Sequence, residues 1–177
     1  MRAVVCHRYR SSGAALAIEE VENPTLGDSD VLVRIEAAAL NRRDLRHVAG
    51  QPTLGKFGGA RAKQEATILG SDLAGRVEAV GTHVTRFAPG DEVYAWVDSG
   101  AFAEYIALPE TALETKPGNL TLEQAAGVPF AAQTALQGLL DHARVRPEHE
   151  VLINGASGGV GTFAVQIARA FGADVTA

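Results

Sequence analysis

The fold is decided by residues 151–161, which read VLINGASGGVG. Three apolar residues typical of a buried strand come first, and a turn rich in glycine follows them. Apolar residues then recur every three or four positions from Val160 to Phe171, and Gly172 is placed to end that helix. Residues 174–177 begin another strand. This order of strand, glycine turn, helix and strand predicts the first β-α-β unit of an α/β domain.

The glycine turn has the properties of a phosphate-binding loop. Gly155 allows a tight turn off the strand, and Gly158 lets the backbone approach a pyrophosphate because it has no Cβ. Gly161 allows the helix to pack closely on the strand. The helix N-terminus adds free N–H groups and a partial positive charge. We therefore expect a dinucleotide here, with a purely structural β–α turn as the alternative. The residue that selects NAD or NADP is expected about 20 positions further on, at or beyond Ala177.

The residues before Pro117 have the pattern of an all-β domain. Short runs rich in Val, Ile and Leu alternate with turn residues, which predicts a β-barrel or sandwich. The expected strands are Ala3–His7, Leu16–Val21, Val31–Leu40, Leu73–Val80, Glu92–Val97 and Ala101–Ala107. Residues 50–66 lack periodicity and are expected to form a long exposed loop.

The pattern becomes helical after Pro117. Thr121 is suited to cap a helix, with Glu123 and Gln124 in its first turn. Pro129 is suited to open a second helix, where its missing N–H costs nothing. We expect the β-barrel domain at residues 1–120, and linker helices with the start of a dinucleotide-binding domain at residues 121–177.

Composition excludes several classes of function. The net charge of −5 is spread over interspersed charges, so no basic stripe exists for nucleic acid. The longest apolar runs are too short to span a membrane, and the N-terminus does not have the pattern of a signal peptide. Cys6 is the single cysteine, which excludes an internal disulfide. A cytoplasmic location is the expectation that follows.

Several motifs together resemble one family over the whole chain. These are GSDLAGRV at 70–77, GDEV at 90–93, GAFAEY at 100–105, residues 129–136 and the glycine turn. They are similar to the quinone oxidoreductase (zeta-crystallin-like) branch of the medium-chain dehydrogenases and reductases. The resemblance implies a mainly β GroES-like barrel followed by a Rossmann domain, of which this chain would hold the first β-α-β unit.

The same resemblance implies that zinc is absent. Zinc alcohol dehydrogenases of this superfamily hold their catalytic metal through Cys, through His beside Glu, and through a second Cys or Asp. The corresponding positions here are Asn41, Ser71 with Asp72, and approximately Phe130. Zinc prefers thiolate and imidazole ligands, and the four-cysteine structural lobe is missing as well. We therefore expect no metal.

The resemblance also assigns candidate site residues. The family's quinone reductases usually carry Asn-Pro-x-Asp where residues 41–44 are NRRD. The resemblance implies that Asn41 and Asp44 are catalytic residues. Asn41 would form a hydrogen bond with a substrate carbonyl, and Asp44 would orient the nicotinamide ribose or its neighbours. The alternative is that both only brace a turn. Thr134 matches a threonine that faces the nicotinamide, unless its hydroxyl bonds only to its own helix. The expected cofactor-binding residues are Thr134, Gly155, Ser157, Gly158, Gly159, Val160 and Gly161.

The expected function is NAD(P)H-dependent hydride transfer to a quinone or an α,β-unsaturated carbonyl, without zinc. NADPH is expected to be preferred over NADH, by resemblance alone, and a homodimer is the expected assembly. The alternatives are an alcohol or aldehyde dehydrogenase, an enoyl reductase module of a larger synthase, and a non-enzymatic barrel that binds another protein. Because a complete Rossmann sheet needs about six strands, we expect these 177 residues alone to be inactive and to fold chiefly as a barrel from Met1 to about Pro117. The C-terminal part is expected to be frayed, or packed against a second copy of the chain.

Overall fold

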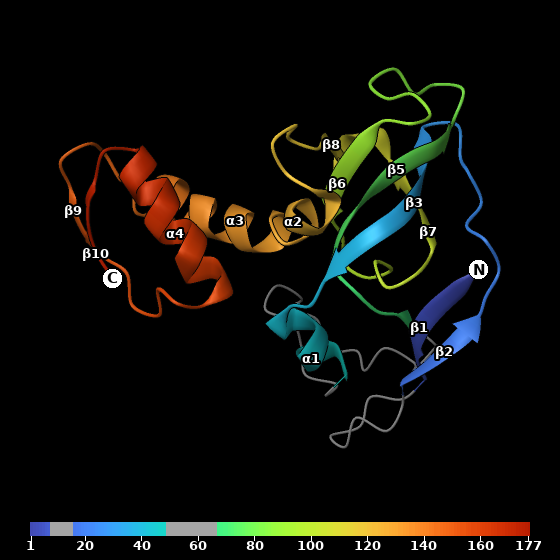
Figure 1. The fold of residues 1–177 in the computed structure, drawn as a ribbon, viewed down its shortest axis with the longest axis horizontal. Helices are drawn as coiled ribbons and strands as arrows, with labels where there is room; N and C mark the ends of the chain where they lie inside the picture. Colours follow the sequence, from blue (N-terminus) through green and yellow to red (C-terminus); the bar gives the residue numbers. More distant parts are fainter. Residues whose placement is uncertain (8–15, 49–66) are drawn as a thin grey trace. The chain divides into compact units, whose positions relative to one another are not determined.

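The structure is a computed structural model that describes residues 1–7, 16–48 and 67–177 (Figure 1). The exposed loop expected at residues 50–66 lies outside these residues. The chain divides into two compact units, Met1–Gly127 and Val128–Ala177. Within the described residues, every helix is too short or too polar to cross a membrane. The mainly β architecture with a terminal β-α-β unit is confirmed.

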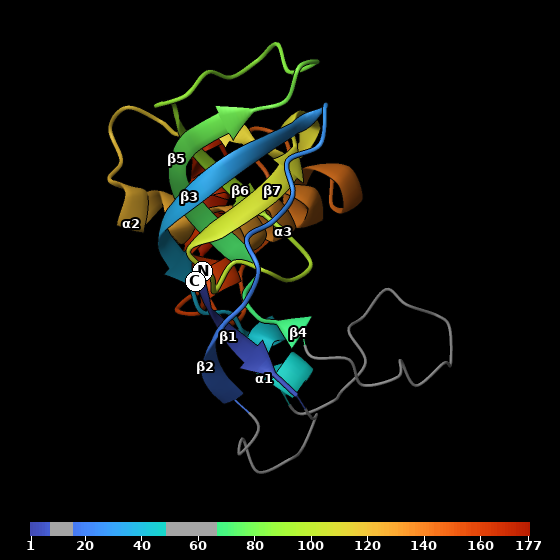
Figure 2. The same cartoon turned by 90° about the vertical axis from the view of Figure 1, so that its right-hand side faces the viewer.

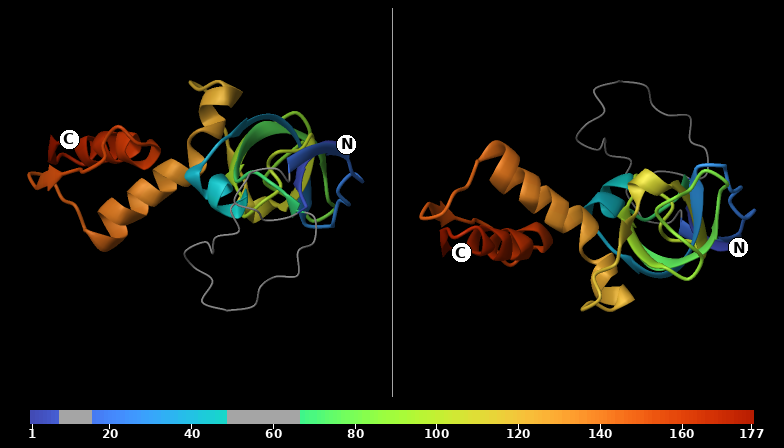
Figure 3. Two further views of the ribbon diagram at one scale, coloured as in Figure 1. Left: turned by 90° about the horizontal axis from the view of Figure 1, so that it is seen from below. Right: turned by 90° about the horizontal axis from the view of Figure 1, so that it is seen from above.

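The first unit is built on a five-stranded antiparallel sheet in the order β7-β3-β5-β6-β8. Its strands are β3 (Asp30–Ala39), β5 (Asp72–Val80), β6 (Glu92–Trp96), β7 (Tyr105–Pro109) and β8 (Glu114–Thr115). Figure 2 shows β3 lying between β5 and β7. The strands curve around a common centre when the unit is seen from above or below (Figure 3). Alternate side chains of β3 and β6, including Val31, Val33 and Val93, fill that centre.

Both faces of β5 are buried at its start, which its sequence of small and apolar residues allows. Leu73 and Val77 belong to the central core, whereas Ala74 points the other way. Ala74 packs against Ala125 and Ala126 of α2 (Leu122–Ala126). Thr121 caps α2 through a capping box with Gln124, as the sequence predicted.

A second sheet of the first unit has the order β2-β1-β4. It contains β1 (Arg2–Cys6), β2 (Leu16–Glu20) and the two-residue β4 (Thr67–Ile68). The strand predicted at Ala101–Ala107 begins only at Tyr105. Residues 101–104 instead run beside β1, where Val4 N–H donates to the Phe102 carbonyl at 2.8 Å and Ala3 bridges Ala103. The prediction was wrong here because this extended segment joins two sheets and has no continuous ladder.

Three further short elements complete the first unit. Helix α1 (Arg42–Val48) follows β3, and the 3₁₀ turn η1 (Glu110–Ala112) joins β7 to β8. Together with β4 and β8 they were not predicted, because elements this short contain no full period of an apolar pattern.

The second unit contains the predicted β-α-β motif. Strand β9 (Glu150–Leu152) pairs in parallel with β10 (Asp174–Thr176), and α4 (Gly159–Ala170) connects them. Pro129 opens α3 (Pro129–Leu136), which continues as the π-helical turn η2 (Gln137–His142). Apolar side chains of these helices pack together; the buried members of this core are Ala135, Leu139, Ala164 and Ala168.

Candidate functional site

The glycine turn lies between β9 and α4, as the sequence predicted. Gly155 has φ of +79°, a left-handed conformation that L side chains rarely adopt. Gly158 N–H donates to the Gly155 carbonyl at 3.0 Å and closes the turn. Ser157, Gly158 and Gly159 are exposed, so the outer surface of the turn is open to a ligand.

The glycines differ in how much space surrounds them. A Cβ added to Gly155 or Gly159 would meet no atom within 4 Å, and one at Gly158 would lie 3.3 Å from the Gly155 carbonyl oxygen. At Gly161 the added Cβ would lie 2.2 Å from that oxygen and 2.7 Å from Ala156 Cα. Gly161 therefore packs against the turn itself, where backbone atoms leave no room for a side chain. Its expected role in packing the helix on the strand stays a prediction.

The N-terminus of α4 is suited to an anion. Gly158 is its N-cap residue and offers no side chain to bond the first N–H groups of the helix. By contrast, Thr121 and Gln124 bond the corresponding groups of α2. Exposed glycines, an uncapped helix of 12 residues and its partial positive charge together fit the pyrophosphate of a dinucleotide.

Thr134 lies on α3 in the same unit as the glycine turn. Its hydroxyl donates to the Phe130 carbonyl at 2.7 Å, so the hydroxyl hydrogen is already used within the helix. The oxygen still has lone pairs, and the side chain can therefore accept a hydrogen bond from a ligand. Thr134, Asn154 and Val160 are among the residues that line a cavity of about 670 Å³ in this unit.

Asn41 and Asp44 lie in the first unit, at the start of α1. Asn41 N–H donates to Asp44 Oδ2 at 2.7 Å, and Asp44 N–H donates to the Asn41 carbonyl at 3.0 Å. Asp44 is 4% exposed, and its other oxygen accepts from the Ser71 hydroxyl at 2.9 Å. Both oxygens of Asp44 are therefore engaged within the protein, which is the bracing arrangement that the sequence left open.

Ser71 and Asp72 are hydrogen-bond partners of Asp44 and Asn41, contacts that the sequence did not predict. Both are buried at the start of β5. Asn41 Nδ2 donates to Asp72 Oδ2 at 2.9 Å, and a carboxylate can only accept this bond. The bond orients the Asn41 amide and leaves its second N–H and its oxygen for other partners. Two of the three positions that the resemblance compares with zinc ligands, that of Asn41 and that of Ser71 with Asp72, are thus joined by the bond from Asn41 to Asp72.

We expect Ser71→Ala to destabilise the first unit by about 1–2 kcal/mol, because the buried Asp44 Oδ1 loses its donor. Urea unfolding followed through Trp96, the single tryptophan, measures the loss. Ser29→Ala, which changes an exposed serine, is the matched control. Equal midpoints for Ser71→Ala and wild type would contradict the bracing role of this contact.

Comparison with known proteins finds a matching family and similar sequences. Residues 27–118 match the family described as the alcohol dehydrogenase GroES-like domain. The chain is 34% identical to the chloroplastic quinone-oxidoreductase QR1 of Triphysaria versicolor, covering 100% of this chain and 55% of that protein. It is 37% identical to the chloroplastic NADPH-dependent alkenal/one oxidoreductase of Arabidopsis thaliana, covering 96% and 44%.

A solved structure shows the same likeness in three dimensions. The alcohol dehydrogenase superfamily protein from Novosphingobium aromaticivorans superposes with a TM-score of 0.87 and 36% identity. The superposition covers 99% of this chain and 52% of that one. The chain therefore spans about half the length of these relatives.

Proposed function

From the premise that the chain belongs to the alcohol dehydrogenase GroES-like family, we propose that the protein is an NADPH-dependent, zinc-independent oxidoreductase. The proposed acceptor is a quinone or an α,β-unsaturated carbonyl compound. The observation that carries the proposal is the open glycine turn at the uncapped N-terminus of α4. Relatives named as a quinone oxidoreductase and an alkenal/one oxidoreductase support the choice of acceptor.

The residues of the turn hold the cofactor in this proposal. Gly155, Ser157 and Gly158 provide the exposed surface, and the first N–H groups of α4, at Gly159, Val160 and Gly161, face the phosphates. Thr134 accepts a hydrogen bond through the lone pairs that its helix leaves unused. The nicotinamide cofactor supplies a hydride when bound.

In the first unit, Asn41 is the proposed catalytic residue. Its second Nδ2 N–H donates to the substrate carbonyl oxygen and so favours the negative charge that develops there. Asp72 orients this amide by accepting the other N–H at 2.9 Å. Asp44 acts through Asn41, whose backbone N–H it bonds. It is a positioning residue in this proposal.

The cofactor preference can be tested directly. In a full-length version with a complete dinucleotide-binding domain, we expect NADPH to bind at least about tenfold more tightly than NADH, which corresponds to about 1.4 kcal/mol. Parallel titrations followed by nicotinamide fluorescence give both dissociation constants. Equal affinity or a preference for NADH would reject this part of the proposal, and binding of neither would reject the cofactor site.

Zinc independence is tested by elemental analysis and by a chelator. Asn41 and Ser71 stand where the resemblance places zinc ligands, and they are bonded to Asp72 and Asp44 instead. We expect elemental analysis of the dialysed protein to find far less than one zinc per chain. Reduction should also survive a chelator. Stoichiometric zinc that resists dialysis would overturn the proposal.

We also propose a homodimer and a cytoplasmic location. Both relatives quoted from curated proteins are described as chloroplastic, so fractionation of the source cells is the decisive measurement for location. Sedimentation of the purified protein measures the assembly. A monomer at micromolar concentration would reject the dimer.

A further inference from the structure

Arg43 of α1 lies against the ring of Trp96, at the end of β6. Its guanidinium carbon is 5.3 Å from the ring centroid, within the range of a cation–π contact. Nη2 forms an ion pair and a hydrogen bond with one carboxylate oxygen of Asp98. The Arg43 side chain is 16% exposed, whereas that of Asp98 is 74% exposed. A partly buried cation thus has a counter-ion that lies largely in water.

Of the two nitrogens on one edge of the guanidinium, only Nη2 forms a hydrogen bond among the residues that the structure describes. Nε and Nη2 form one edge of the group, with two parallel N–H bonds that match the two oxygens of a carboxylate. Asp98 Oδ1 occupies Nη2, and the 3.5 Å approach of the Asp98 carbonyl also falls on Nη2. Nε is shielded from water and has no hydrogen-bond partner in the described part of the chain. Buried donors without a partner are uncommon in folded proteins.

We propose that this edge of Arg43 is a subsite for the carboxylate of a small organic acid, which takes the place of Asp98. Nε is shielded while Asp98 is in place, so Asp98 moves aside and the guanidinium turns on the ring of Trp96 to present this edge. The incoming carboxylate then accepts from both Nη2 and Nε. Asp98 already shows that a carboxylate fits at Nη2, and its exposure lets it move aside into water.

The surroundings favour a singly charged ligand. Asp44 and Asp98 lie on or against α1, and Asp72 stands opposite Trp96 in the β5–β6 ladder. A phosphate dianion would face these carboxylates with one guanidinium to neutralise it, so a monoanion fits better than phosphate.

The subsite also lies beside the candidate catalytic cluster. Arg43 is two residues from Asn41, and Asn41 bonds to Asp72, the register partner of Trp96. A substrate whose carbonyl is held by Asn41 could therefore place a carboxylate on Arg43. This second step rests on the proposed function and assigns the substrate to enones or quinones that carry a carboxylate.

Trp96 makes the subsite measurable without any turnover, because it is the single tryptophan of the chain. The purified protein is titrated with acetate, and separately with inorganic phosphate, at constant ionic strength. We expect a saturable change of Trp96 emission with acetate, and a dissociation constant for phosphate at least about threefold higher. Asp98→Asn removes the competing carboxylate and should tighten acetate binding by about fivefold or more.

Variants of Arg43 distinguish recognition by two parallel N–H bonds from attraction to a positive charge alone. Arg43→Gln should abolish the response, and Arg43→Lys should weaken it by about tenfold because a lysine has no planar fork. Arg42→Gln, at an exposed neighbour on α1, should behave as wild type. A response that does not saturate, persists in Arg43→Gln, or does not tighten in Asp98→Asn would overturn the subsite. If Arg43→Gln fails to fold, the Asp98→Asn titration still decides.

Kinetics test the assignment to substrate. With NADPH and a full-length version with a complete dinucleotide-binding domain, an enone acid should have a kcat/KM at least about tenfold above that of its methyl ester, and Arg43→Lys should remove this difference through KM. Equal values for acid and ester would overturn the assignment to substrate. Reduction of neither compound would reject the proposed function, whereas the acetate titration would still decide the subsite.

Discussion

Gly161→Ala is expected to unfold the glycine turn and the start of α4. Its new Cβ would lie 2.2 Å from the Gly155 carbonyl oxygen and 2.7 Å from Ala156 Cα. Both are backbone atoms, so the turn must move as a whole. Overpacking of this kind costs about 1–3 kcal/mol even where side chains can adjust, and we expect the upper end of that range.

The measurement is amide hydrogen exchange, because the single tryptophan lies in the other unit. Protection of residues 159–170 should fall by about a hundredfold, while that of β3 and β5 stays unchanged. Gly159→Ala is the matched control, since its Cβ would meet no atom within 4 Å. Unchanged protection in Gly161→Ala would show that the turn has room that this geometry does not allow.

Gly158→Val should separate binding from folding at the same turn. Its Cβ would lie 3.3 Å from one carbonyl oxygen, an approach that a small adjustment relieves. The side chain would nevertheless occupy the space that a pyrophosphate needs. We expect normal hydrogen exchange together with a loss of dinucleotide affinity of about a hundredfold. Normal affinity would mean that the turn serves the fold alone.

The sequence predicted those parts of the fold that repeat a pattern over several residues. β3, β5 and β6 alternate or run apolar for at least five residues, and α4 has a full apolar stripe. Helix α1 was missed because RRDLRHV has no such stripe. It forms where Asn41 and Asp44 bond to each other across its first turn. Such a contact depends on the three-dimensional setting of the segment.

The residues of the candidate site likewise differ in whether the sequence could predict them. The glycine turn was predicted because all its parts are adjacent in sequence. The bond from Asn41 to Asp72 joins residues 31 positions apart, and local pattern contains no information about it. A signal was nevertheless present. The zinc alcohol dehydrogenases of the same superfamily bind one metal through the positions that correspond to 41 and 71, so side chains at these positions are expected to lie close together.

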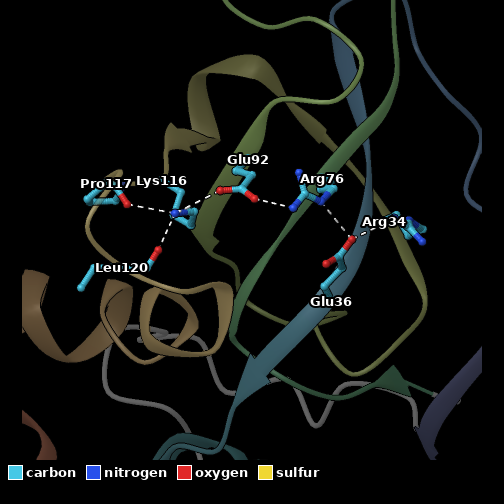
Figure 4. A network of polar contacts seen from close by, with 7 residues as sticks. All are labelled: Arg34, Glu36, Arg76, Glu92, Lys116, Pro117 and Leu120. Carbon is cyan, nitrogen blue, oxygen red and sulfur yellow. Dashed lines mark hydrogen bonds and ion pairs between the residues drawn. The ribbon is translucent and has the colours of Figure 1, made fainter.

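Polar side chains cross the five-stranded sheet in a continuous network that ends at a buried lysine (Figure 4). Lys116 has a side chain that is 6% exposed, and its Nζ is 3.0 Å from Glu92 Oε2. The ammonium also donates to the carbonyls of Pro117 and Leu120, so its three N–H groups have three acceptors. It thereby fixes the turn that leads into α2.

Lys116 and Arg76 lower the pKa of Glu92, with the hydrogen bond from Lys116 as the largest cause. A carboxyl whose pKa is lowered in the folded state stabilises the protein above its ordinary pKa. That contribution is lost as the pH falls through the lowered folded value. Removing Lys116 should therefore matter most near neutral pH.

Lys116→Met is expected to destabilise the first unit by about 2–3 kcal/mol at pH 7, because hydrogen bonds to a charged donor are lost at the Pro117 and Leu120 carbonyls. Urea unfolding followed through Trp96 should show the difference from wild type shrinking as the pH falls below about 4. Arg34→Gln, at the exposed end of the same network, should cost less than about 1 kcal/mol. If Lys116→Met costs no more than Arg34→Gln, the buried ammonium does not organise this turn. A cost that is the same at pH 7 and at acidic pH would show that the ion pair with Glu92 contributes nothing to it.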